Sequence, residues 1–239
     1  MNYWQLSRSP RYTILFAAPL ILAYEGLAWL LQGGSTSGVR NGADVLLKSL
    51  FLSLGGGRGL LLFDLLLIGI GVTLVWRDRG PLRPVVFLGM FAEAVGLALL
   101  FGIVAGTLTA LLLNGPSALA VGGLKDLGLS TQVMLSLGAG IYEELLFRVI
   151  LVSGLVWLAR RAFGWLPGVS NLFAVVVGAL IFSAFHYVGP YGDAWQLQSF
   201  TFRFVAGVLF SGLFVLRGFG ITAWTHALYD VFLSVAGVV

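Results

Sequence analysis

The sequence predicts an all-α, polytopic membrane protein that crosses the bilayer about seven times. Hydrophobic residues make up 59% of its 239 residues, charged residues only 10%, and the mean hydropathy is +0.97. A soluble domain has about 25% charged residues, so the composition excludes that class. The 33 glycines suit helices that pack closely in lipid.

Seven apolar stretches are long enough to span about 30 Å of hydrocarbon at about 1.5 Å per residue. The first is too long for a cleavable signal peptide, and no small-residue cleavage site follows it. A shorter segment, Ala43 to Leu54, is expected to be an interfacial helix. Without a repeat or second domain, residues 1–239 are expected to form one integral membrane domain. The predicted spans are Tyr12 to Leu31, Gly59 to Trp76, Val85 to Leu113, Thr131 to Ala159, Asn171 to Val188, Phe200 to Leu216 and Ile221 to Val239.

Basic residues flank the predicted spans and favour a cytoplasmic N-terminus. With that orientation eight of them lie on the inner side and four on the outer side, in agreement with the positive-inside rule. They are spread between apolar segments, so the net charge of +4 does not indicate a nucleic-acid partner. The inner residues are Arg8, Arg11, Arg77, Arg79, Arg83, Arg160, Arg161 and Arg217, and the outer ones are Arg40, Lys48, Arg58 and Lys125.

Two neighbouring glutamates and an arginine lie within the apolar stretch Thr131 to Ala159. Ionisable groups are costly in hydrocarbon and are functional candidates there. On an α-helix Glu144 and Arg148 share a face, so the arginine can neutralise that carboxylate. Glu143 points about 100° away and stays free to act as a general base. A purely structural ion-pair network is the alternative.

The two histidines of the chain also lie in patterned positions. His226 and Asp230 are four residues apart, so the aspartate can fix the imidazole tautomer or join the histidine as a metal ligand. His186 ends the fifth span, near the outer surface, whereas His226 lies near the inner end of the seventh, so a tilted or broken helix is needed to bring them together. With Glu143 these groups can activate water and stabilise an oxyanion. Taken singly, each also fits a structural hydrogen bond.

Four further charged residues fall within predicted spans and suggest a proton or ion pathway as a rival function. They are Glu25, Asp64, Glu93 and Arg203. Transporters usually show paired, interrupted repeats, which this sequence lacks. Arg203 and Glu93 are each expected to pair with an opposite charge or to line a cavity near the substrate. With no cysteine the chain has no disulfide, thiolate metal site or cysteine nucleophile.

Three motifs in this order resemble the CPBP family, which comprises CAAX prenyl endopeptidases related to the Ras converting enzyme and many bacterial abortive-infection and immunity-like proteins. The motifs lie in a core of about residues 131–239, and the first half of the chain holds nothing equally diagnostic. Each motif alone is weak, but together they use both histidines. They are Glu143-Glu144-x-x-x-Arg148, Phe182-x-x-x-His186 and His226-x-x-x-Asp230.

The resemblance implies an intramembrane endopeptidase with a polar cavity buried among its helices. It implies that Glu143 and His186 activate the attacking water and that Arg148 holds Glu144. It further implies that His226 and the residue at position 230 stabilise the oxyanion.

Position 230 departs from the family pattern, which commonly has asparagine. Because aspartate donates a hydrogen bond only when protonated, the oxyanion role falls mainly on His226, and Asp230 is expected to orient it. No cofactor is expected for glutamate-type chemistry. Zinc is the alternative, since the family was first described as metal-dependent and the same side chains are plausible ligands, namely Glu143, His186, His226 and Asp230.

The substrate is expected to be a membrane protein or a lipidated peptide, cut near its C-terminus as in CAAX or sorting-tail processing. We expect the protein in a bacterial inner membrane, with the lipid bilayer and the substrate as partners. A transporter or ion pathway, and a non-proteolytic immunity or scaffold protein that keeps the motifs, are the alternatives.

Overall fold

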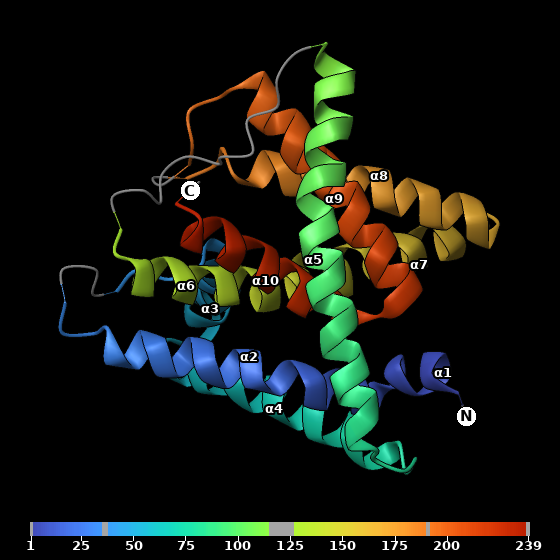
Figure 1. The fold of residues 1–239 in the computed structure, drawn as a ribbon. Helices are drawn as coiled ribbons and strands as arrows, with labels where there is room; N and C mark the ends of the chain where they lie inside the picture. The colour runs from blue at the N-terminus through green and yellow to red at the C-terminus, as the bar shows by residue number, and fades with distance from the viewer. Residues whose placement is uncertain (1, 35–37, 115–126, 190–191, 238–239) are drawn as a thin grey trace.

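The computed structural model describes residues 2–34, 38–114, 127–189 and 192–237. Within these residues the secondary structure is helical, without a strand, which confirms the predicted all-α class (Figure 1). Lys125 and the last two residues of the seventh predicted span lie outside the described residues. The helices are α1 (Tyr3–Ser7), α2 (Pro10–Leu30), α3 (Gly42–Gly55), α4 (Gly57–Arg77), α5 (Pro84–Leu113), α6 (Leu129–Gly138), η1 (Ala139–Val152), α7 (Ser153–Ala162), α8 (Pro167–Phe185), α9 (Leu197–Arg217) and α10 (Phe219–Val235).

Among the described residues, five helices are long and apolar enough to cross a membrane, namely α2, α4, α5, α8 and α9. Each matches a predicted span to within a few residues. The predicted span Thr131 to Ala159 is divided among α6, η1 and α7. The last span corresponds to α10, which has 17 residues and measures about 26 Å, less than the hydrocarbon thickness of about 30 Å. These two crossings therefore stay predictions.

The predicted interfacial helix is α3, and its start and end follow from single residues. The side chain of Asn41 caps the helix, since its Oδ1 accepts a hydrogen bond from the backbone N–H of Ala43 at 2.9 Å. The helix ends at Gly56, whose φ of 57° is a conformation that glycine adopts without strain. The chain reverses there, and α4 packs back against α3.

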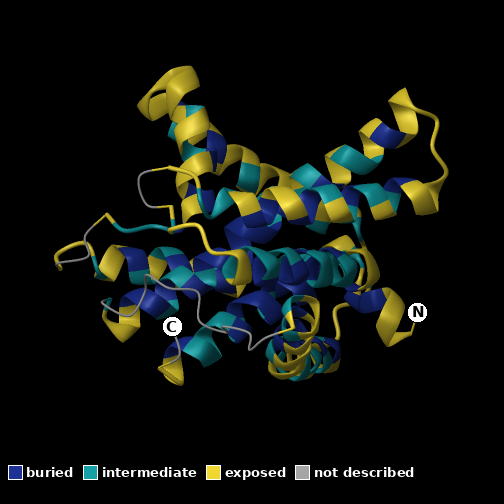
Figure 2. Ribbon diagram, turned by 90° about the horizontal axis from the view of Figure 1, so that it is seen from above, coloured by how far each residue is buried: buried dark blue, intermediate teal, exposed yellow. Residues whose placement is uncertain are grey.

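Helix α10 lies in the middle of the bundle, in contact with α2, α5, α6, η1 and α9 (Figure 1). Buried residues gather on the inner helices, while outer faces and helix ends are exposed (Figure 2). At Gly140, η1 approaches α10 closely: a Cβ atom there would lie 2.5 Å from the carbonyl oxygen of Ala223 and 2.6 Å from the Cβ of Ala227. Small residues allow such close backbone approach.

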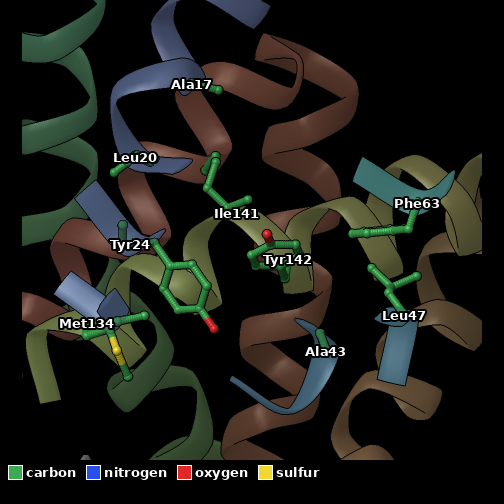
Figure 3. Packing of buried hydrophobic residues seen from close by; sticks show 12 residues of the cluster. Ala17, Leu20, Tyr24, Ala43, Leu47, Phe63, Met134, Ile141 and Tyr142 are labelled. Atoms are coloured by element: carbon green, nitrogen blue, oxygen red, sulfur yellow. The ribbon is translucent and has the colours of Figure 1, made fainter. Parts of the chain in front are cut away.

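A core cluster between α2, α6 and η1 fixes the position of η1. Tyr24 and Tyr142 pack edge to face, with ring centroids 5.3 Å apart, beside Met134 and Ile141 (Figure 3). The phenol of Tyr24 donates to Asp44 at 2.8 Å. Because Tyr142 directly precedes the two glutamates, this packing holds their stretch of η1 in place.

Helix η1 is a π-helix, in which each N–H bonds to the carbonyl five residues earlier. The sequence predicts an α-helix for this stretch, which is wrong, although the Glu144–Arg148 pair predicted from the four-residue spacing is present at 3.1 Å. At the end of η1 the hydroxyl of Ser153 donates a hydrogen bond to the carbonyl oxygen of Arg148, five residues earlier, at 3.1 Å. Helices of this type are frequent at functional sites, and this one carries Glu143 and Glu144.

Candidate active site

A cavity of about 320 Å³ lies among α6, η1, α9, α10 and the end of α8. Its lining includes the four side chains that the sequence analysis assigned to catalysis, Glu143, His186, His226 and Asp230. The two histidines thus reach one cavity. His186 directly follows α8, whereas His226 lies in the middle of α10, which turns back from α9 after the single residue Gly218 (φ 79°). The expectation that His186 and His226 lie at different membrane depths assumed that both helices were straight, full-length spans.

Glu143 is held by a residue that the sequence analysis missed. Nδ2 of Asn41 donates to Oε1 of Glu143 at 2.9 Å, while Oδ1 of the same amide caps α3. These two contacts fix the orientation of the amide. Glu143 is 8% exposed and has no other hydrogen bond among the described residues, so one carboxylate oxygen is anchored and the other is available. An asparagine before a predicted helix indicates a helix cap, but it does not indicate the contact between Asn41 and Glu143.

Glu144 contacts Arg148 on its own helix and His226 on α10. Its Oε1 lies 3.1 Å from Nη1 of Arg148 and 2.6 Å from Nδ1 of His226. Both Glu144 and Arg148 are 0% exposed. The guanidinium lies between the rings of Phe182 and Phe210, at 4.4 and 5.4 Å from their centroids. Such contacts favour a cation in a dry site.

The imidazole of His226 has a carboxylate near each nitrogen. Glu144 is at Nδ1, and Oδ2 of Asp230 is 3.5 Å from Nε2. The sequence analysis assigned the orienting role to Asp230, but Glu144 is the nearer of the two. Because an ionised carboxylate only accepts hydrogen bonds, Nδ1 donates to Glu144, and Nε2 is the nitrogen left for a reacting group. Phe210 stacks on the ring at 4.3 Å.

His186 is oriented by the main chain. Its Nδ1 lies 2.9 Å from the carbonyl oxygen of Phe182, four residues earlier. A carbonyl oxygen only accepts, so Nδ1 carries a proton, and in the neutral ring Nε2 has a free lone pair. The motif Phe182-x-x-x-His186 therefore supplies a backbone acceptor as well as a ring contact, with centroids 5.0 Å apart.

The other charged residues of the predicted spans do not form a continuous pathway. Glu93 pairs with Arg217 at 2.5 Å and is outside the cavity lining. Glu25 pairs at 2.7 Å with Arg40 in the loop before α3. Asp64 is exposed on α4. Arg203 pairs with Asp193, and both residues line the cavity.

The side chains proposed as zinc ligands line one cavity but do not converge. Within the described residues, no group of three or more His, Asp or Glu is arranged to hold a metal ion. The contacts of Nδ1 to Glu144 and to the Phe182 carbonyl are also common for histidine ligands, so it is the spacing of the side chains that does not fit zinc. The described side chains are therefore not arranged as a zinc site.

Comparison with known families points to the same part of the chain. Residues 126–232 match the family model described as type II CAAX prenyl endopeptidase Rce1-like, and this range contains all three motifs. The match confirms the predicted resemblance, and with the apolar helices it identifies an integral membrane protein. No curated protein and no solved structure matches the chain.

Proposed function

Because residues 126–232 are similar to the type II CAAX prenyl endopeptidases, we propose that this protein is an intramembrane endopeptidase of the CAAX type. It hydrolyses a peptide bond near the C-terminus of a membrane-associated substrate. The proposal rests on one cavity that is lined by Glu143, which Asn41 anchors, and by both histidines. With Nδ1 of each ring engaged, Nε2 of His186 is available to accept a hydrogen bond and Nε2 of His226 to donate one.

Water is activated by Glu143 and His186. The free oxygen of Glu143 accepts a proton from water, while Nε2 of His186 accepts a hydrogen bond from the second O–H and aligns the lone pair. The water oxygen bonds to the scissile carbonyl carbon and gives a tetrahedral intermediate. Glu143 then passes its proton to the amide nitrogen, the C–N bond breaks, and a carboxylic acid and an amine form. The acid gives its remaining water-derived proton to the amine, so a carboxylate and an ammonium group leave.

The negative charge on the intermediate is stabilised by His226. With both nitrogens protonated, Nδ1–H donates to Glu144 and Nε2–H donates to the oxyanion. Arg148 neutralises Glu144 in its dry surroundings, so the carboxylate keeps its position and charge. Asp230, at 3.5 Å from Nε2, holds the ring in the resting state and yields this nitrogen to the oxyanion.

We propose that this chemistry uses no resident cofactor. Its support is that the carboxylate and imidazole groups present supply a base, a proton donor and an oxyanion partner. The substrate is a membrane protein or lipidated peptide whose tail enters the cavity. We place the protein in a bacterial inner membrane as part of this proposal, and the distribution of basic residues supports a cytoplasmic N-terminus.

The test compares membrane-protein termini in cells that carry the wild type, Glu143→Gln or Asp64→Asn. Both variants change an acid to its amide, but Asp64 is exposed on α4 and serves as the matched control. We expect truncated termini with the wild type and Asp64→Asn, and their loss with Glu143→Gln. Identical termini in all three would refute the proposal, and altered ion flux without altered termini would favour a transporter.

A further inference from the structure

Arg203 is a buried cation of the cavity with unused hydrogen-bond donors. It lies on α9, is 3% exposed and lines the cavity. Its Nη2 donates to Asp193, whereas Nε and Nη1 have no hydrogen-bond partner among the described residues. Buried polar groups are nearly always paired, so two free donors on one side chain call for an explanation.

The other guanidinium in the cavity lining is more fully neutralised. Nη1 of Arg40 lies 2.7 Å from Glu25 and 3.6 Å from Asp44. Among the described residues, Arg203 has a single carboxylate partner, Asp193, whereas Arg40 has two. Arg203 is therefore the better anion-binding group of the two.

The position of Arg203 is tied to the catalytic histidine. The backbone N–H of Asp193 donates to the carbonyl of His186 at 2.9 Å. The hydroxyl of Ser183 donates to the carbonyl of Phe200 at 2.7 Å, which joins α8 to α9. The guanidinium also lies 5.2 Å from the ring centroid of Tyr187. An anion held by Arg203 would thus stand in a fixed relation to the water-activating group.

The donors of Arg203 and the volume and lining of the cavity indicate which anion fits. A guanidinium presents paired donors that match a carboxylate. The cavity volume of about 320 Å³ is at the low end of small-ligand sites, about 300–1,000 Å³, so it holds a short chain end. Part of the lining is apolar, namely Phe101, Phe202, Phe210 and Leu233.

We infer that Arg203 binds the free C-terminal carboxylate of the substrate, so that the cavity selects a chain end with apolar side chains over an internal segment. This inference rests on the proposed endopeptidase function and names the group that its cavity recognises. Asp193, which also lines the cavity, holds the guanidinium through Nη2.

The test uses one quenched fluorescent peptide in two forms. The peptide ends in a prenylated cysteine followed by valine, isoleucine and methionine, with either a free carboxylate or a carboxamide. For the wild type we expect kcat/KM to be about 10- to 100-fold higher for the acid, as for a hydrogen bond to a charged group. Arg203→Gln should bring the two forms close to equality, mainly through loss of the acid, whereas Arg203→Lys should keep part of the preference.

Two further variants separate recognition from a structural ion pair. Asp193→Asn breaks the pair but keeps the guanidinium, so the preference for the acid should persist. If Arg203 served only to pair with Asp193, the Asp193→Asn and Arg203→Gln variants would behave alike. Arg217→Gln is the matched control, because Arg217 is also 3% exposed and paired with one carboxylate, Glu93, outside the cavity lining.

Binding to the Glu143→Gln protein gives a readout that does not need hydrolysis, and there too the acid should bind more tightly than the amide. Equal Glu143-dependent cleavage of both forms by the wild type would overturn the role of Arg203 and leave the proposed function intact. An undiminished preference for the acid in Arg203→Gln would do the same. If neither form is bound or cleaved, the proposed function fails, and the inference fails with it.

Discussion

Replacing Arg148 by methionine tests how the buried charges support both the fold and the site. The change removes the guanidinium but keeps an unbranched chain between two aromatic rings. Glu144, which is 0% exposed, would keep His226 at 2.6 Å as its remaining partner. Removing one partner of a buried ion pair costs about 3–5 kcal/mol. Because one partner remains, we expect about 3 kcal/mol, the lower end of that range.

The expected loss corresponds to a measurable change in melting temperature. A destabilisation of 1 kcal/mol shifts the melting temperature by about 2–4 °C in a chain of this size, so the single variant should melt about 6–12 °C lower. The double variant Arg148→Met, Glu144→Gln removes both charges and should recover most of the loss, since a neutral pair leaves no buried charge. Its activity should stay low because Nδ1 of His226 has lost its carboxylate.

Tryptophan fluorescence during heating in detergent measures the stability, and peptide cleavage by the same preparations measures the activity. A single variant that melts with the wild type would refute an uncompensated buried charge. A double variant that melts below the single one would show that the ion pair is not the source of the loss. Recovered cleavage in the double variant would refute the role of Glu144 in positioning His226.

Three other predictions concern single side chains. Asn41→Asp keeps the helix cap but replaces the donor to Glu143 by a second buried carboxylate, so turnover should fall about 10- to 100-fold and the melting temperature should fall as well; normal turnover would contradict the anchoring role. Asp230→Asn should retain substantial activity, with and without a mild chelator, and a chelator-sensitive loss restored by zinc would instead identify a metal ligand. Glu93→Gln removes the charge opposite the buried Arg217 and should reduce stability by about 1–3 kcal/mol, while the folded protein cleaves its peptide at the normal rate; a large fall in that rate would place Glu93 in the catalytic machinery.

The helices were predictable from the sequence because local composition determines them. Long apolar stretches predicted α2, α4, α5, α8 and α9 to within a few residues. Spacing by four residues also indicated that Glu144 faces Arg148, which lies at 3.1 Å. Local spacing could not reveal the π-helical turn of η1, since an α-helical and a π-helical stretch have the same apolar composition.

The sequence pattern could not predict hydrogen bonds between side chains that lie far apart in the sequence. Asn41 and Glu143 are 102 residues apart, and Glu144 and His226 are 82 apart. The choice between Glu144 and Asp230 as the nearer carboxylate depends on how closely η1 approaches α10. Only the packed helices determine that distance.

Because Gly140 has no side chain, backbone contacts determine the distance between η1 and α10 at the site. The distance between η1 and α10 is limited there by main-chain and Ala227 methyl atoms that would lie within 2.6 Å of a Cβ, not by long side chains that can change rotamer. Warming, detergent exchange or a different lipid can rearrange flexible side chains, but cannot shorten a contact between two backbones. The separation of Glu144 from His226 should therefore vary little between membranes, and changes in activity with lipid composition would arise from substrate entry.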